Sequence, residues 1–161
     1  MHSVIMVMGV SGCGKSTVGQ ALSDALGGVF VEGDDYHPQS NIDHMAAGLP
    51  LTDAMRWPWL DRLAEAVNDQ RQRSVTVFGC SALRKSYRDR LRAAIPDLKV
   101  AYLEAPQDLL ATRLAKREGH YMPASLLASQ YDTLEVPENP NVATSANQPI
   151  AQIIQIFKSA I

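Results

Sequence analysis

The chain has 161 residues, a length that fits one domain of common size. Hydrophobic residues make up 46% and charged residues 20%, a balance that excludes wholesale disorder and is ordinary for a globular protein. The net charge of −2 argues against a nucleic-acid-binding protein, whose domain usually carries a strong excess of basic residues. We therefore expect a single globular domain over residues 1–161 that binds no nucleic acid.

The cysteines and the apolar runs indicate where the protein acts. Cys13 and Cys80 lie in different segments, so we expect reduced thiols in a cytosolic protein rather than a disulfide. The longest apolar run, Val4 to Val10, is much shorter than the ~20 residues of a membrane-spanning helix. It also lacks the basic segment that opens a signal peptide. The sequence thus predicts a cytoplasmic protein without a membrane contact.

Short apolar runs alternate with longer segments of helical periodicity along the chain. The expected elements are, in chain order, a strand at 3–8, a helix at 15–26, a strand at 29–32, helices at 38–48 and 53–72, a strand at 74–79, a helix at 83–95, a strand at 99–103, helices at 106–117 and 125–133, a strand at 142–145 and a helix at 150–160. Such alternation predicts an α/β fold with a parallel sheet and helices on both of its faces. Ligands of such folds bind at the carboxyl ends of the strands.

A glycine-rich motif follows the first expected strand. Residues 9–16, GVSGCGKS, fit the pattern G-x-x-x-x-G-K-[ST], in which backbone N–H groups and a helix N-terminus surround phosphate oxygens. Lys15 is expected to reach the β- and γ-phosphates of ATP as a catalytic residue, and the Ser16 hydroxyl to ligate Mg²⁺. The expected nucleotide-binding residues are Gly9, Val10, Ser11, Gly12, Cys13, Gly14, Lys15, Ser16 and Thr17.

Other motifs narrow the kind of nucleotide-binding protein. The guanine-reading pattern N-K-x-D is absent, and the only D-x-x-G, at 24–27, lies at the end of an expected helix. Motor ATPases carry an acidic residue at the end of the strand beside the P-loop strand. The strand expected at 74–79 ends without a carboxylate, which argues against a motor ATPase. A small kinase remains, which needs a mobile lid that excludes water and brings positive charge to the transition state. Arg113 and Arg117 precede Gly119, so we expect a lid at about residues 113–135 and these arginines among the catalytic residues.

Acidic residues follow the second expected strand, in the order Glu32-Gly33-Asp34-Asp35. A hydroxyl acceptor needs a carboxylate that orients it and takes its proton. We expect Asp34 in this role, with Asp35 as the second candidate. Glu32 is expected to hold a water on Mg²⁺.

Basic residues recur at helical spacing in the helix expected at 83–95. Three arginines, Arg84, Arg88 and Arg92, should form one basic face bordered by Lys85, opposite the apolar stripe at positions 83, 87 and 91. A nearly neutral protein that gathers cations near a phosphate site is expected to bind an anionic acceptor. Arginine suits a carboxylate because it makes two parallel hydrogen bonds. Arg56, near the start of another helix, is a further candidate for this contact.

Several stretches of the chain resemble the ATP-dependent gluconate kinases, relatives of shikimate kinase and the nucleoside monophosphate kinases. They are MGVSGCGKST at 8–17, GDDYHP at 33–38, Asn41, MAAGLPLTD at 45–53, Arg56, PWL at 58–60, CSAL at 80–83, YRD at 87–89, GHYM at 119–122 and SQYDTLE at 129–135. The likeness runs from about residue 8 to residue 137. The segments at 33–60 and 129–135 are far more specific than the glycine-rich motif.

The resemblance implies the three-layer P-loop kinase fold, with a five-stranded parallel sheet, a mobile lid, Mg²⁺ and frequently a homodimer. It implies transfer of the γ-phosphoryl group of ATP to the C6 hydroxyl of D-gluconate, giving 6-phosphogluconate. An arginine at a place similar to Arg56 holds the substrate carboxylate in shikimate kinases, so Arg56, with Lys85 or Arg88, is expected to bind the gluconate carboxylate. His120 is expected to serve the substrate from the lid, and His37 to be a packed histidine.

Two alternatives stay open on the residues alone. The acceptor could be another small hydroxy acid such as shikimate, or a nucleotide. The protein could also be an ATP-binding sensor without an acceptor, although a sensor needs no proton acceptor beside the γ-phosphate. No motif fixes the residues that contact adenine, and the turn at 147–149 is the candidate.

Overall fold

The computed structural model describes residues 1–116 and 124–161. Its elements are β1 (Val4–Met8), α1 (Lys15–Ala25), β2 (Val29–Glu32), the 3₁₀ turn η1 (Gly33–Tyr36), α2 (Gln39–Ala46), α3 (Asp53–Gln70), β3 (Thr76–Gly79), α4 (Lys85–Ala94), β4 (Lys99–Glu104), α5 (Gln107–Lys116), α6 (Ala124–Thr133), β5 (Val142–Ser145) and α7 (Ile150–Ala160). The expected elements are confirmed, with boundaries that differ by at most two residues within the described ranges.

The strands of the described chain form one five-stranded parallel sheet in the order β2-β3-β1-β4-β5. β1 lies in its centre, and all five of its residues are buried. A strand covered on both faces reads as a continuous apolar run, which is why VIMVM shows no polar alternation. The predicted parallel sheet is therefore confirmed.

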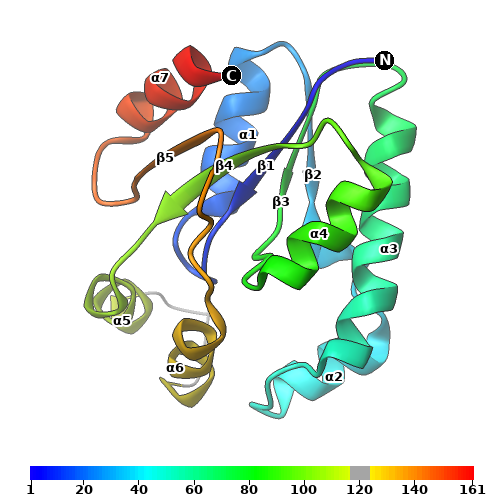
Figure 1. Ribbon diagram of the computed structural model, residues 1–161. Coiled ribbons are helices and arrows are strands. Elements are labelled where there is room, and N and C mark those ends of the chain that lie inside the picture. The colour runs from blue at the N-terminus through cyan, green and yellow to red at the C-terminus, as the bar shows by residue number, and fades with distance from the viewer. Residues whose placement is uncertain (117–123) are drawn as a thin grey trace.

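Helices cover both faces of the sheet and give the molecule three layers (Figure 1). Met6 of β1 packs in a core with Leu63 of α3 and Leu91 of α4. Val7, on the opposite face of the same strand, packs in a second core with Leu22 of α1. Helix α7 joins this second core through residues 153 and 157.

Helix α3 is the long element that leads away from the site. Its first turn is capped by the Thr52 side chain, which accepts a hydrogen bond from the Met55 N–H group at 3.3 Å. Pro58 lies within the helix, near its N-terminal end. In the part of the chain that the structure describes, α3 and the other helices do not combine the length and apolar character needed to cross a bilayer.

The carboxyl ends of the strands are surrounded by smaller elements. Helices α2, α5 and α6 gather at this end of the sheet (Figure 1). The neighbours of β1 in the sheet are β3 on one side and β4 on the other. The chain therefore builds the sheet outward from β1 in one direction with β2 and β3, and in the opposite direction with β4 and β5. This reversal opens a crevice beyond the carboxyl end of the central strand, which is where an α/β sheet binds ligands.

Candidate active site

The phosphate loop connects β1 to α1 at this crevice. Gly12 and Gly14 have φ angles of 84° and 101°, which favour glycine because a Cβ atom is strained there. The loop ends at Gly14, and α1 begins at Lys15 with its N-terminus directed into the site. The Lys15 Nζ group folds back over the loop and donates a hydrogen bond to the Val10 carbonyl at 3.0 Å.

The two residues expected to serve the metal are in contact. The Ser16 hydroxyl, in the first turn of α1, donates a hydrogen bond to the Glu32 carboxylate at the end of β2. Mg²⁺ prefers hard oxygen ligands and is usually held by one or two protein groups together with phosphate oxygens and water. In residues 1–116 and 124–161 no group of three or more His, Cys, Asp or Glu side chains could hold a metal ion by itself. The Ser16–Glu32 pair therefore fits Mg²⁺ that arrives with a nucleotide.

Asp34 is displayed on the turn η1, directly after β2. The turn is packed tightly, since a Cβ atom at Gly33 would overlap the backbone oxygen of Gly79 at the end of β3. The Trp59 indole N–H donates to the Gly33 carbonyl at 2.8 Å and anchors the turn to α3. The Asp34 side chain is 82% exposed at the site, and Asp35 beside it is exposed as well. A rigid turn thus carries an accessible carboxylate.

Cys80 marks the point where the charged site residues converge. Burial raises the pKa of the Cys80 thiol to about 12, and the nearby charges of Lys15, Asp34 and Glu32 also act on it. Gly79, at the end of β3, pairs with Val7 of β1 and with Glu32 of β2, so the segments after β1 and β2 start beside the end of β3, as expected for a crevice at the carboxyl ends of parallel strands. Both cysteines are free and buried, which confirms the expected thiols, and the Cys80 thiol stays protonated and unreactive.

Arg56 is held in place by aromatic and acidic neighbours. Its side chain is 15% exposed, and its guanidinium carbon lies 4.9 Å from the ring centre of Tyr87. Its Nη1 group donates to the Leu51 carbonyl. The Asp53 carboxylate lies 3.7 Å from Arg56 and accepts a hydrogen bond from the Tyr87 hydroxyl at 2.6 Å. Burial lowers the pKa of Arg56, but a guanidinium stays protonated in proteins, so the site keeps an oriented positive charge.

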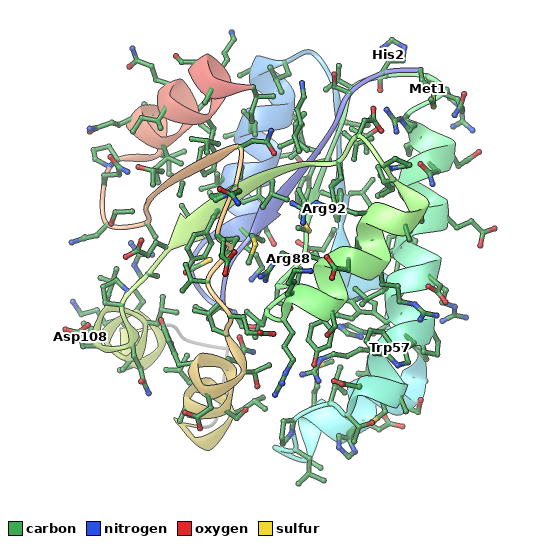
Figure 2. The ribbon with its side chains drawn as sticks, viewed as in Figure 1. Met1, His2, Trp57, Arg88, Arg92 and Asp108 are labelled. Carbon is green, nitrogen blue, oxygen red and sulfur yellow. The ribbon has the colours of Figure 1, made fainter. Side chains whose placement is uncertain are left out.

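The expectation that Arg88 belongs to a basic face opposite the apolar stripe is wrong. The stripe at 83, 87 and 91 is buried as predicted, but Arg88 is itself only 4% exposed. Arg88 lies on α4 (Figure 2). Its Nη1 and Nη2 groups donate to the carbonyls of Ala82 and Glu135 at 2.8 and 3.0 Å. The segment after α6 covers the start of α4, where the Glu135 N–H donates to the Leu83 carbonyl at 2.7 Å. Arg88 therefore joins two backbone segments, including the turn in which Ala82 has a φ angle of 43°.

The remaining basic residues of α4 differ in exposure. Arg84 is exposed and Arg92 is half-buried. The Lys85 side chain is 72% exposed and pairs with Asp89, with 2.6 Å between Nζ and Oδ2. Its backbone N–H donates to the Glu135 side chain at 3.1 Å. The role of Lys85 toward a substrate stays a prediction.

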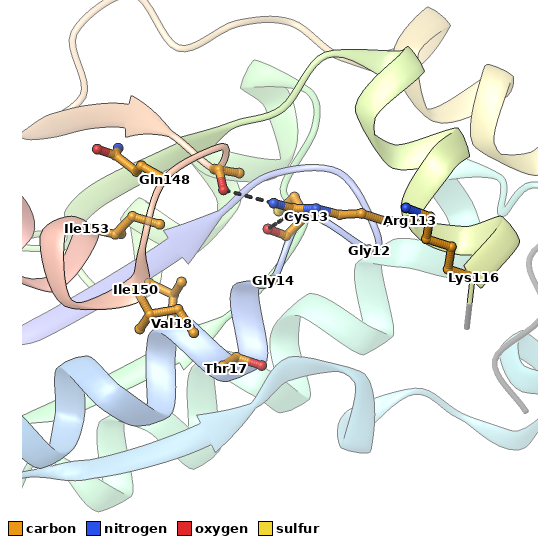
Figure 3. A pocket seen from close by; sticks show the side chains of 11 residues that line it. Gly12, Cys13, Gly14, Thr17, Val18, Arg113, Lys116, Gln148, Ile150 and Ile153 are labelled. Atoms are coloured by element: carbon orange, nitrogen blue, oxygen red, sulfur yellow. Dashed lines mark hydrogen bonds between the residues drawn. The ribbon is translucent and has the colours of Figure 1, made fainter. Parts of the chain in front are cut away.

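Arg113 lines a cavity of about 350 Å³ on the outer side of the phosphate loop. It reaches from α5 toward the loop and donates to the carbonyls of Cys13 and Ala146 at 3.5 and 3.0 Å (Figure 3). Gln148 and Ile150, which follow β5, line the same cavity, so it includes the turn proposed for adenine. Arg117 and His120, the other expected lid residues, lie outside the described residues.

Sequence reasoning assigned no role to Gln130 of α6. Its side chain binds the Ser11 N–H and hydroxyl groups of the phosphate loop. Gln130 lies in the SQYDTLE stretch, but 119 positions separate it from Ser11, so no local pattern connects them.

His37 is 8% exposed, which confirms the expected packed histidine. The residues that surround it could not be named from the sequence.

Comparison with known proteins agrees with this geometry. A family model described as an AAA domain matches residues 4–137. A gluconokinase of Gluconobacter oxydans is 47% identical over 134 residues, which cover 83% of this chain and 75% of that protein. The thermosensitive gluconokinase of Escherichia coli is 39% identical over 160 residues, or 97% of this chain and 86% of that protein. The chain belongs to this AAA domain family and to the gluconokinases.

A crystal structure of a gluconokinase from Sinorhizobium meliloti 1021 shows the same fold. It superposes with a TM-score of 0.88 at 45% identity and covers 98% of this chain and 90% of that chain. The P-loop kinase fold expected from the sequence is therefore confirmed. The predicted membership in the gluconokinase family is confirmed as well, and the family match spans the stretches on which that prediction depended.

Proposed function

We propose that this chain transfers the γ-phosphoryl group of ATP to the C6 hydroxyl of D-gluconate, giving 6-phospho-D-gluconate and ADP. The observation that carries the proposal is the contact between Ser16, beside Lys15 at the end of the phosphate loop, and Glu32, two residues before Asp34 and paired with Gly79 at the end of β3. Its family membership supports the same activity, since relatives at 39% and 47% identity are gluconokinases.

The nucleotide would lie along the phosphate loop and the cavity beside it. The loop amides and Lys15 face the phosphates, and the positive end of α1 favours their charge. The cavity of about 350 Å³ lined by Arg113, Gln148 and Ile150 is large enough for a purine ring. We assign Arg113 to nucleotide binding in this cavity in preference to the charge-stabilising role expected from the sequence, because its hydrogen bonds reach Cys13 and Ala146.

Ser16 and Glu32 would hold Mg²⁺ at the phosphates, Ser16 through its hydroxyl and Glu32 through a bound water. The metal supplies positive charge that offsets the charge developing on the transferred phosphoryl group. Glu32 holds the Ser16 hydroxyl in position at the start of α1. This arrangement uses few protein ligands, as Mg²⁺ sites at nucleotides do.

The acceptor would lie between two charged residues. Asp34 takes the proton of the C6 hydroxyl of gluconate. The oxygen of that hydroxyl bonds to the γ-phosphorus, and the bond between the γ-phosphorus and the bridging oxygen of ADP breaks. Arg56 binds the carboxylate at the other end of gluconate, since it is charged and fixed by Tyr87 and Leu51. Arg88 is less suited to this contact because two of its N–H groups already bind backbone carbonyls.

Several expectations remain predictions that belong to this proposal. Arg117 and His120 would act from the lid, and Lys85 would assist Arg56. We also propose that the protein acts in the cytoplasm, forms a homodimer and binds no nucleic acid.

A panel of acceptors tests the function directly. Release of ADP would be followed by a coupled assay with ATP and Mg²⁺ and with gluconate, shikimate, a nucleoside monophosphate or no acceptor. We expect rapid ADP release with gluconate only. Release with shikimate or a nucleotide in its place would favour the kinase of another acceptor. ATP binding without acceptor-dependent ADP release would identify a sensor.

A further inference from the structure

We propose that His37 is a positioning residue that orients the Asp34 carboxylate through its Nε2–H group. The inference rests on the proposed role of Asp34, the group that takes the proton of the acceptor hydroxyl. His37 directly follows the turn η1 that displays Asp34. Its Nε2 atom lies 3.8 Å from Asp34 Oδ1.

Packing fixes the plane of the His37 ring. The side chain is 4% exposed, and the ring stacks on Trp59 with a distance of 4.1 Å between centroids and an angle of 19° between planes. Trp59 is itself anchored, because its indole N–H donates to the Gly33 carbonyl at 2.8 Å. The same tryptophan therefore holds the residue before Asp34 and the histidine three positions after it. The imidazole cannot rotate without losing this stack.

Asn41 decides which ring nitrogen carries the proton. Its Nδ2 atom donates to the Met55 carbonyl at 3.0 Å and lies 3.1 Å from His37 Nδ1. A backbone carbonyl only accepts hydrogen bonds, so the amide nitrogen of Asn41 must face Met55. The second hydrogen on that nitrogen then binds His37 Nδ1. We infer from this network that the neutral ring carries its proton on Nε2, on the side of Asp34.

Burial favours the neutral form of the His37 ring. Burial lowers the pKa of His37; the Asp34 carboxylate acts against this effect, and the Arg56 guanidinium adds to it. A neutral donor orients a carboxylate without the full positive charge that would make the carboxylate a weaker base. The Asp34 side chain is 82% exposed, so packing alone does not set its orientation. A hydrogen bond from Nε2 requires Oδ1 to move from its distance of 3.8 Å to about 3 Å.

Two variants separate the hydrogen-bond donor from the packing. His37→Phe keeps an aromatic ring against Trp59 but removes the Nε2–H group. His37→Gln gives up the ring and keeps an N–H donor near the same place. We expect His37→Phe to lower kcat with gluconate by about 10–10²-fold, as the misplacement of a reacting group does, with KM for ATP unchanged. His37→Gln should retain more of kcat than His37→Phe.

A purely structural role would reverse this order, since phenylalanine preserves more of the packing, and that result would overturn the proposal. Thermal unfolding of both variants checks that each is folded. The neutral tautomer can be read on the wild-type protein itself by ¹⁵N NMR of the imidazole. At pH 7 we expect a neutral ring protonated on Nε2. A charged ring, or a proton on Nδ1, would contradict the proposal.

The Asp34→Asn background separates this inference from the proposed function. Adding His37→Phe to Asp34→Asn should change kcat by less than about twofold, because the carboxylate that His37 orients is gone. An equal loss in both backgrounds would show that His37 does not act through Asp34. If Asp34→Asn alone leaves kcat unchanged, the proposed role of Asp34 fails. If Asp34→Asn lowers kcat but His37→Phe does not, only the role of His37 fails.

Discussion

The side-chain amide of Gln130 makes two hydrogen bonds to Ser11. Its Oε1 atom accepts from the Ser11 N–H group at 2.7 Å, and its Nε2 group donates to the Ser11 hydroxyl at 2.8 Å. Ser11 lies in the phosphate loop, whereas Gln130 lies on α6, within the range 113–135 that the sequence predicts to form the lid. Helix α6 is thus attached to the loop that would hold the nucleotide.

We expect Gln130→Ala to weaken both the fold and nucleotide binding. Loss of two neutral hydrogen bonds should lower the free energy of unfolding by about 1–2 kcal/mol, which urea denaturation measures. The loop would lose its support from α6, so KM for ATP should rise by up to about tenfold, the equivalent of about 1.4 kcal/mol. KM for gluconate should change less.

Gln155→Ala on α7 is the matched control, because Gln155 is exposed and does not line the cavity beside the phosphate loop. It should leave KM for ATP and the free energy of unfolding close to their wild-type values. If Gln130→Ala behaves like this control, the contact with Ser11 has no role in nucleotide binding.

Asp34→Asn should lower kcat by about 10²–10⁴-fold, the usual contribution of a general base, with little change in ATP binding. The asparagine has the shape of the aspartate but cannot take the proton of the acceptor hydroxyl. Steady-state kinetics with gluconate and ATP measure the effect. Asp35→Asn, at the adjacent exposed position, is the control and should keep most of kcat. The opposite ranking would move the base to Asp35.

Arg56 and Arg88 differ in a way that kinetics and stability can separate. Arg56→Ala should chiefly raise KM for gluconate, because it removes binding that ground state and transition state share. Arg88→Met should chiefly lower the free energy of unfolding, by about 1–3 kcal/mol, since it leaves the Ala82 and Glu135 carbonyls without their donors. The measurements are KM for each substrate and urea denaturation. A stable Arg88→Met protein with a raised KM for gluconate would return Arg88 to the substrate site.

Local signals explain why the helices and strands could be predicted closely. The Gly27–Gly28 pair stops α1, and the GVSGCGKS motif places a strand before it and a helix after it, so neighbours in sequence carry the information. Arg88 shows the limit of such signals. Its place in α4 fits a basic helical face, but its partner carbonyl at Glu135 is 47 positions away and arrives only when the chain folds back after α6.

In the candidate site, too, some contacts were predictable from the sequence and others were not. Lys15, Ser16, Glu32 and Asp34 lie at or just after strand ends. Parallel strands bring such positions to one edge of the sheet, so their proximity was predictable. The contact of Gln130 with Ser11 and the stack of His37 on Trp59 depend on how separate elements pack. Nothing in the spacing of these residues indicates which side chains will face one another.

The buried Arg71, which contacts the N-terminal segment at His2, leads to a prediction about the stability of the fold in acid. Arg71 is 3% exposed and donates two hydrogen bonds to Asp97, at 2.7 and 2.6 Å, and two to the His2 carbonyl. The hydrogen bonds from Arg71 lower the pKa of Asp97 to about 2 from its ordinary 3.8. The carboxylate therefore contributes stability that is fully present above pH 4 and is lost as the pH falls through about 2. Asp97→Asn should be less stable than wild type at pH 6 by urea denaturation, and the difference should shrink from pH 4 to pH 2. A difference that stays constant over this range would show that the charge of Asp97 does not stabilise the fold.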